Sequence, residues 1–329
     1  MGMKLSISTI KKSIPLLKKA GVAAGFISAA KPSEKNDTAP IVAEALFVSG
    51  GDRVHFLNTG RSDCILIQSN GHFALVDCSD EQHIHTVTDY LKKVAGDENG
   101  VVHLDFLAVT HAHEGHMGGV KQLLSDGKIS VDTVYIKPLC DDKFSDVERQ
   151  LHSSAELFKT CVDAVRQAGI KLVSEIPADY FDFGSFRLRF VNTEPDNYHI
   201  GVSENDNTLG LLISKGDKKL LLTGDMVNDT GDLARLANLF GRVDVLQLPC
   251  HGQAVLSKDT IKAFSPEVMI ATNSACDIPH QILGECMLNS DGKLYSTVEN
   301  DGVIVTFAEN GTLCLTKDIH KIKGESENA

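Results

Sequence analysis

The chain has 329 residues, of which 42% are hydrophobic and 23% charged, as is ordinary for a globular protein. No apolar run reaches the roughly 20 residues that a membrane-spanning helix needs, so no membrane span is expected. The formal net charge of −12 disfavours long nucleic acid as a partner, although it still admits a small phosphate ester drawn in by metal ions.

Residues 1–30 resemble a signal or targeting segment, because they carry five lysines and no acidic residue and end in the small-residue stretch AGVAAGFISAA. An export signal, an organelle presequence and an exposed amphipathic helix all fit this composition. The eight cysteines form no C-x-x-C pair and several lie in apolar runs, which favours reduced, buried thiols and a reducing compartment. Export through residues 1–30 and a cytoplasmic location therefore both stay open. Residues 31–52 are expected to be a linker.

From residue 53 onward, short apolar or alternating runs separated by turn residues predict strands. In chain order they are RVHFLN, DCILIQS, HFALVD, LDFLAVT, VDTVYIK, FRLRFV, LGLLISK, KKLLLTG, VDVLQL, EVMIAT, GVIVTF and TLCLT. Helices are expected over EQHIHTVTDYLKKVAG, GHMGGVKQLL, residues 144–168, VNDTGDLARLANLF, and near 258–264 and 279–287. Strands come first, then alternate with helices, and the pattern recurs. This order predicts an α/β domain over residues 53–316, with two mixed sheets face to face and helices outside, followed by a polar tail at 317–329.

Three histidines follow the predicted buried strand LDFLAVT in the stretch THAHEGHMGG, residues 110–119. In an extended loop, His111 and His113 point the same way, whereas His116 at a helix start faces a neighbouring position. Neutral histidine is the commonest protein ligand for zinc and similar ions. A lone histidine is usually structural, but three in this pattern at a strand end predict a metal site.

Two later strand ends supply further candidate ligands. Asp225 follows a glycine in LLLTGDM, and His251 stands between proline and glycine residues in LQLPCHGQ. Strand ends are where a sheet presents site residues on loops, and a carboxylate there can bridge two cations. The predicted metal ligands are therefore His111, His113, His116, Asp225 and His251, of which Asp225 and His251 are also the predicted catalytic residues.

These three motifs in this order resemble the metallo-β-lactamase superfamily. The stretch VHFLNTGRSDCILIQSNGHFALVDCSD is similar to the opening of the hydrolase domain of bacterial competence DNA-uptake proteins, and the resemblance covers residues 53–316. It implies a four-layer αβ/βα sandwich (the metallo-β-lactamase fold) that holds one or two zinc ions, or manganese, at the sheet edge. It also implies that Asp77 orients the site from behind the ligands and that Asp63 is a structural loop residue.

The sequence departs from the family pattern at four places: two lie in the expected ligand set, and the other two are Asn58 and Ser62 in the early loop and Ile278 before Pro279. Gly115 stands where the family has a metal-binding aspartate, and Cys250 stands where relatives often have histidine. The second metal would keep only His116, His251 and a shared Asp225, so it should bind more weakly. Three alternatives stay open: Glu114 could swing in, the Cys250 thiolate could replace a ligand, or one tight metal could work with a labile second one.

The favoured function is a metal-dependent hydrolase of a small or short phosphoester or phosphodiester, with metal-activated water as nucleophile. The ester class comes from the resemblance, and no G-x-S-x-G elbow or P-loop offers another mechanism. If the substrate has a choline head, the aromatic residues Tyr180, Phe181, Phe183 and Tyr198 are candidates to line the mouth of the site. The alternative is a degenerate, non-catalytic fold that acts as a binding module, as Gly115 and Cys250 would suggest. Nothing in the sequence indicates the oligomeric state.

Overall fold

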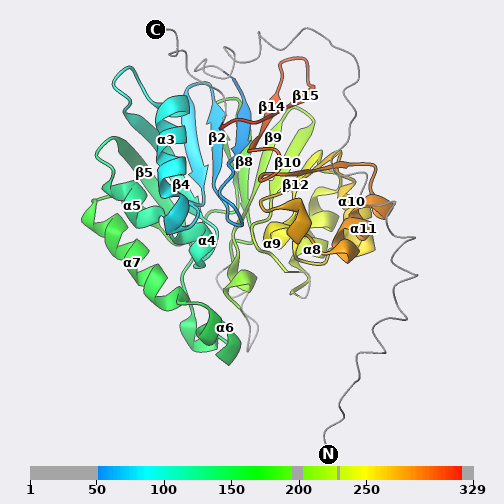
Figure 1. Cartoon of the computed structure of the whole chain (residues 1–329), viewed down its shortest axis with the longest axis horizontal. Coiled ribbons are helices and arrows are strands. Elements are labelled where there is room, and N and C mark those ends of the chain that lie inside the picture. The colour runs from blue at the N-terminus through cyan, green and yellow to red at the C-terminus, as the bar shows by residue number, and fades with distance from the viewer. Residues whose placement is uncertain (1–50, 195–202, 228–229, 321–329) are drawn as a thin grey trace, which may run out of the picture. The chain divides into compact units, whose positions relative to one another are not determined.

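The computed structural model describes residues 51–194, 203–227 and 230–320 (Figure 1). The expected targeting segment 1–30, nearly all of the expected linker 31–52, and the tail beyond residue 320 lie outside the described residues. None of the helices within these ranges has the length and apolar character needed to cross a membrane.

The described residues form two sheets. The first has eight strands in the order β15-β14-β1-β2-β3-β4-β5-β6, in which β3 to β6 are parallel and the other pairs antiparallel. Its strands are β1 (Arg53–Phe56), β2 (Ile65–Ser69), β3 (His72–Val76), β4 (Val102–Val109), β5 (Ile129–Ile136), β6 (Lys171–Val173), β14 (Val303–Phe307) and β15 (Leu313–Lys317). The last two strands of the chain therefore return to the sheet that the first strand began.

The second sheet has seven strands in the order β13-β12-β11-β10-β9-β8-β7, with β10 to β13 parallel and β7 to β10 antiparallel. Its strands are β7 (Tyr180–Phe183), β8 (Phe186–Val191), β9 (Gly210–Lys215), β10 (Lys218–Leu222), β11 (Val245–Gln247), β12 (Val268–Ala271) and β13 (Lys293–Ser296). Three short strands, β6, β7 and β13, were not expected from the sequence pattern.

Helices cover the outer face of each sheet (Figure 1). The first sheet carries α3 (Ile84–Ala95), α5 (Val120–Ser125) and α7 (Ser154–Gln167), and the second carries α8 (Asp232–Phe240), α10 (Lys258–Phe264) and α11 (His280–Asn289). Strand alternation separates the cores: Ile65 and Ile67 pack between the sheets, whereas Leu66 packs under the helices. The predicted α/β sandwich of two sheets with helices outside is confirmed.

Three short helices lie at the end of the sheets where the parallel strands finish (Figure 1). They are α4 (Glu114–Met117), α6 (Asp146–Leu151) and α9 (Pro249–Gly252). The single helix expected over 144–168 is wrong, because the chain breaks between α6 and α7. His152 there has an extended backbone, with φ −130° and ψ 143°.

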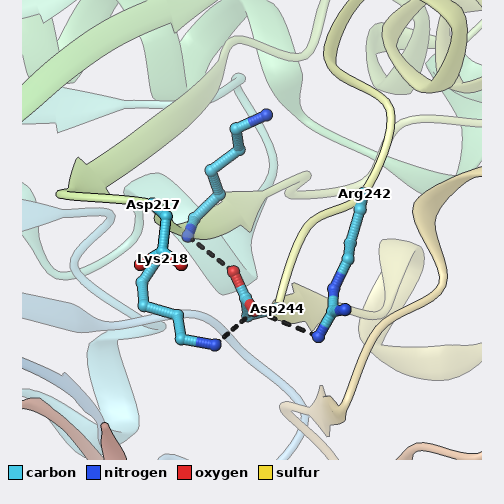
Figure 2. A pocket seen from close by; sticks show the side chains of 5 residues that line it. Asp217, Lys218, Arg242 and Asp244 are labelled. Atoms are coloured by element: carbon cyan, nitrogen blue, oxygen red, sulfur yellow. Dashed lines mark hydrogen bonds and ion pairs between the residues drawn. The ribbon is translucent and has the colours of Figure 1, made fainter. Parts of the chain in front are cut away.

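A cavity of about 230 Å³ lies at the opposite end of the second sheet (Figure 2). There Lys218 and Arg242 bind the carboxylate of Asp244 at 2.9 and 3.4 Å, and the backbone nitrogen of Lys219 donates to it at 2.9 Å. This network ties the beginnings of β10 and β11 together. Its cations Lys218 and Arg242 are already paired with Asp244. The predicted ligands follow the ends of those strands.

Candidate metal centre

The structure brings all five predicted ligands to one place. His111 and His113 follow β4, His116 lies in α4, Asp225 follows β10, and His251 lies in α9 just after β11. All five are buried. The loops are tied to one another, since the Leu209 backbone donates to the carbonyl of Thr110 and the Cys250 backbone to that of Gly224.

Local backbone geometry turns His251 toward this centre. Cys250 and His251 both have left-handed conformations, with φ of 49° and 57°, so α9 is a tight turn rather than a regular helix. Such a conformation costs roughly 1–2 kcal/mol for each non-glycine residue and is typical of functional sites.

The first group consists of His111, His113 and Asp225. The Nε2 atom of His111 lies 3.1 Å from Nδ1 of His113 and 3.9 Å from Oδ2 of Asp225. Ligand atoms of a tetrahedral zinc ion with bonds of about 2.1 Å stand about 3.4 Å apart. The two separations lie on either side of this value, and all three ligand-type atoms lie within 4.8 Å of one another, so the group fits one ion.

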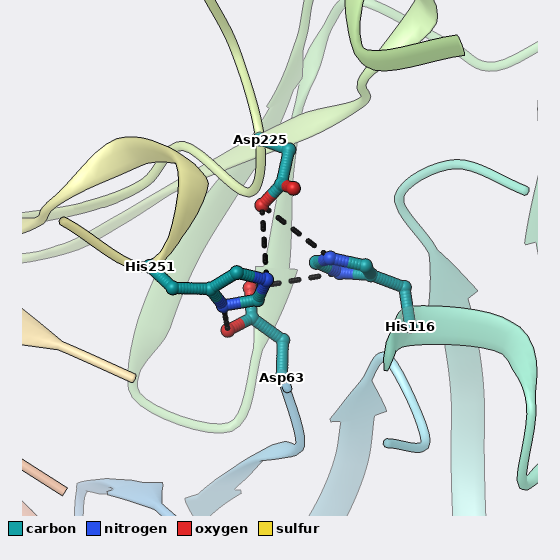
Figure 3. A group of neighbouring side chains, drawn as sticks. All are labelled: Asp63, His116, Asp225 and His251. Carbon is teal, nitrogen blue, oxygen red and sulfur yellow. Dashed lines mark ion pairs between the residues drawn. The ribbon is translucent and has the colours of Figure 1, made fainter. Parts of the chain in front are cut away.

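The second group shares Asp225 (Figure 3). Its other oxygen, Oδ1, lies 3.4 Å from Nε2 of His116 and 3.5 Å from Nε2 of His251. Asp225 thus turns one carboxylate oxygen to each group, which is the geometry of a bridging ligand. Asp63 also belongs to this group, whose ligand-type atoms all lie within 4.8 Å of one another.

Two buried polar atoms at this second group, Nε2 of His116 and Oδ1 of Asp225, have no hydrogen-bond partner. A buried polar atom without a partner is rare and calls for an explanation such as an ion. The His116 nitrogen and the Asp225 oxygen face each other at 3.4 Å, the spacing of two ligands of one ion, so the residues present fit a divalent cation.

In each of the four histidines, the ring nitrogen that faces away from the centre has a hydrogen-bond partner of its own. In the pattern typical of metal sites, such partners fix the tautomer and aim the other nitrogen at the ion. The pairs are His111 Nδ1 with Thr110 Oγ1 at 3.0 Å, His113 Nε2 with Glu148 Oε1 at 2.7 Å, His116 Nδ1 with Asp77 Oδ2 at 2.7 Å, and His251 Nδ1 with Thr272 Oγ1 at 3.0 Å.

Asp77 lies where the resemblance places an orienting aspartate. It is completely buried, and besides His116 it accepts hydrogen bonds from the backbone nitrogen and the hydroxyl of Thr110, both at 2.7 Å. Burial raises the pKa of Asp77, although the charge and the hydrogen bond of His116 oppose this.

The charges of the centre favour a bound cation. Burial lowers the pKa of His116, but Asp225 and Asp77 raise it well above its usual range. Burial and the neighbouring histidines hold the pKa of His111 well below its usual range, so this ring is neutral and its lone pair is available. Carboxylates that hold a proton on His116 would hold a metal ion in its place.

Neither residue proposed as a substitute for the missing aspartate reaches the centre. The Cys250 thiol donates to the backbone oxygen of Asp225 at 3.1 Å, and it belongs to neither group of ligand-type atoms. Glu114 is exposed, and its carboxylate lies over Gly118 on the outer side of α4. The described geometry therefore places neither side chain among the ligand-type groups.

Two carboxylates beside the centre were not predicted as site residues. Asp63 was expected to be structural, but it is 1% exposed and lies within the second group. Glu148 was expected only as part of a helix, but it holds His113. Burial raises the pKa of Glu148. The hydrogen bond and charge of His113, together with hydrogen bonds from Ser203 and Ser154, outweigh this effect and lower the pKa to about 2. No spacing in the sequence marks either residue, because each acts across the fold.

The aromatic residues expected at the mouth of the site have different surroundings in the structure. Phe183 is buried between the two sheets and Phe181 packs against the same core. Tyr180 stacks with the guanidinium of Arg187, which lies 4.5 Å from its ring centre. Tyr198 lies outside the described residues. Phe181 and Phe183 therefore belong to the core rather than to the mouth of the site.

No family model and no curated protein matches this sequence. Solved structures do resemble it at low identity. The metallo-β-lactamase fold protein YhfI from Bacillus subtilis is 12% identical with a TM-score of 0.45, and the match covers 74% of this chain and 95% of that one. The short form of human tRNase Z is 14% identical with a TM-score of 0.40, over 69% and 94%.

A third similar structure is CmlA, a diiron β-hydroxylase from Streptomyces venezuelae, at 13% identity and a TM-score of 0.40. The match covers 74% of this chain but only 52% of CmlA, so this chain spans about half the length of that protein. A shared arrangement of sheets does not define a reaction. The chemistry of this chain therefore has to come from its own site.

Proposed function

We propose that this chain is a metal-dependent hydrolase of the metallo-β-lactamase superfamily that cleaves phosphoester or phosphodiester bonds in small substrates. The observation that carries the proposal is the shared carboxylate of Asp225, which turns Oδ2 to one pair of histidines and Oδ1 to the other. Imidazole and carboxylate donors suit zinc, with manganese as the alternative.

When bound, metal ions at these positions would lower the pKa of water and polarise the ester oxygen under attack. The residues of the chain hold the positions for them. His111 and His113 belong to the first, His116 and His251 to the second, and Asp225 supplies negative charge to both. No protein nucleophile is needed, and the partly buried Cys250 thiol is held by a hydrogen bond.

An anionic substrate is supported by Arg61, an exposed residue on the loop between β1 and β2. Its backbone oxygen lies 3.5 Å from where a β-carbon at residue 115 would stand, so the loop borders the centre. The charge of Arg61 also reaches His152, which stacks on His113: burial and the charges of His113 and Arg61 lower the pKa of His152. No described ion pair includes Arg61, which leaves a guanidinium near the centre for a phosphoryl oxygen.

Hydrolysis of bis-p-nitrophenyl phosphate and p-nitrophenyl phosphate by zinc- or manganese-loaded protein tests the proposal. Asp225→Asn should lower kcat/KM by about 100-fold or more, because it removes the charge shared by both positions. Asp163→Asn, which changes an exposed ion pair on α7, is the matched control and should leave the rate unchanged.

A non-catalytic binding module is the second candidate, and Gly115 favours it because it offers no ligand to the second position. Protein that carries metal but cleaves neither phosphoester would contradict the proposed reaction and support this candidate. Equal rates for wild-type protein and Asp225→Asn would also contradict the proposal, since the activity would then come from elsewhere.

A further inference from the structure

Glu148 is a buried carboxylate that lies outside the predicted ligand set. It is 3% exposed, and its Oε1 atom lies 2.7 Å from Nε2 of His113. The same oxygen accepts a hydrogen bond from the hydroxyl of Ser154 at 2.9 Å. The other nitrogen of His113, Nδ1, faces Nε2 of His111 at the first position. Glu148 thus holds one edge of His113 while the opposite edge faces the first metal position.

The corner between α6 and α7 is built to keep Glu148 in place. The Ser145 hydroxyl caps α6 by accepting from the Glu148 backbone nitrogen at 3.1 Å. The chain is then extended at His152, and α7 begins with Ser154, whose hydroxyl returns to Glu148. The His152 ring stacks on His113 at 4.0 Å with an interplanar angle of 20°. This corner therefore contacts the His113 ring twice: Glu148 bonds to its edge, and His152 stacks on its face.

The contact between His113 and Glu148 has the length of a hydrogen bond. Together with His152 these two residues could also form a cation site, since their ligand-type atoms lie within 4.8 Å of one another. Two ligands of one ion, however, stand about 3.4 Å apart, and 2.7 Å is typical of a charge-assisted hydrogen bond. The distance therefore favours a direct bond over a shared ion.

We propose that Glu148 is a positioning residue that keeps the proton of His113 on Nε2 and so aims the Nδ1 lone pair at the first metal position. This inference rests on the proposed metal centre. The Glu148 carboxylate also makes the Nδ1 atom of His113 a stronger electron-pair donor to a metal ion. The first position has only His111, His113 and the shared Asp225 from the described residues, so it depends heavily on the orientation of His113.

The test is metal binding by the full chain, measured by competition with a chromophoric chelator and by the visible spectrum of the cobalt-substituted protein. Glu148→Ala should lower the affinity for one of two bound ions by about 10–100-fold and leave the affinity for the other unchanged. Glu148→Gln retains an acceptor for the His113 N–H, so it should lose less. Glu156→Gln, an exposed change on α7, is the matched control. Thermal unfolding of the metal-free proteins checks that each variant is folded.

Unchanged affinities in a folded Glu148→Ala protein would overturn the proposal, and so would equal weakening of both ions. Loss of a third ion would show that Glu148 is a ligand of a separate cation site. If wild-type protein binds no metal, the proposed centre fails and Glu148 loses its role with it. A different outcome, in which wild-type protein binds two ions and Glu148→Ala binds both with unchanged affinity, would leave the metal centre standing and overturn only the role of Glu148.

Discussion

The proposed second metal position depends on the residues that surround Gly115. A β-carbon at this residue would lie 3.4 Å from the Cβ atom of Ser62, and the Gly115 carbonyl accepts from the Asp63 backbone nitrogen at 2.9 Å. The loop that carries Asp63 therefore packs directly on the position where the sequence resemblance led us to expect an aspartate.

Asp63 contacts the far side of the two histidines of that position (Figure 3). Its oxygens lie 3.3 Å from Nδ1 of His251 and 3.7 Å from Nδ1 of His116, whereas the Nε2 atoms of both rings face Asp225. One carboxylate behind both histidines adds negative charge and orients them. It supports the second position without standing between the rings, so the second ion is expected to bind more weakly than the first.

At the scale of the elements, close packing of the α4–α5 corner on the end of β3 fixes His116. A β-carbon at Gly119 would lie 2.2 Å from the backbone oxygen of Cys78, the residue after Asp77. Gly119→Ala should therefore lower the free energy of unfolding by about 1–3 kcal/mol, because the backbone must shift.

Gly127→Ala is the control for this prediction, since nothing lies within 4 Å of the added carbon and the residue has no positive φ. It should change stability by less than about 0.5 kcal/mol in denaturant unfolding. If Gly119→Ala is as stable as Gly127→Ala, the corner is not packed as the structure shows.

The elements also show what local sequence can and cannot predict. Alternation and apolar runs predicted the long strands, such as β2 and β4, because one or both faces of each are buried. The break between α6 and α7 was missed because part of its cause is tertiary: Ser154 bonds to Glu148 six residues earlier, and Glu148 and His152 both contact His113 across the fold. The motif residues at strand ends were predicted as ligands, whereas Asp63 and Glu148 carry no local signal.

At the scale of the whole molecule, a buried titratable pair lies under the helical layer of the first sheet. Val54 and Phe56 face the core between the sheets, so His55 points the opposite way and its Nδ1 lies 2.8 Å from the hydroxyl of Tyr90 on α3. Burial, aided by the charge of Arg53, lowers the pKa of His55 from 6.5 to about 3. The fold therefore holds this ring neutral.

This depressed pKa predicts a loss of stability in acid. Unfolded chains take up a proton on His55 below about pH 6.5, whereas the fold takes it up only near pH 3, so the contribution is complete above pH 6.5 and is lost as the pH falls. At pH 4.5 the loss is about 2–3 kcal/mol. Denaturant unfolding of His55→Gln should show a shallower fall between pH 6.5 and 4.5 than wild-type protein does. Parallel profiles would contradict this account of His55.

The most direct test of the central claim, that Asp225 is shared by two metal positions, is the metal content per chain. Native mass spectrometry after dialysis against zinc should show two ions per chain, with the second lost at a lower chelator concentration than the first. Gly115→Asp should make that second ion harder to remove, because it adds a carboxylate to the second position. Wild-type protein that binds one ion or none under saturating zinc would contradict a shared Asp225.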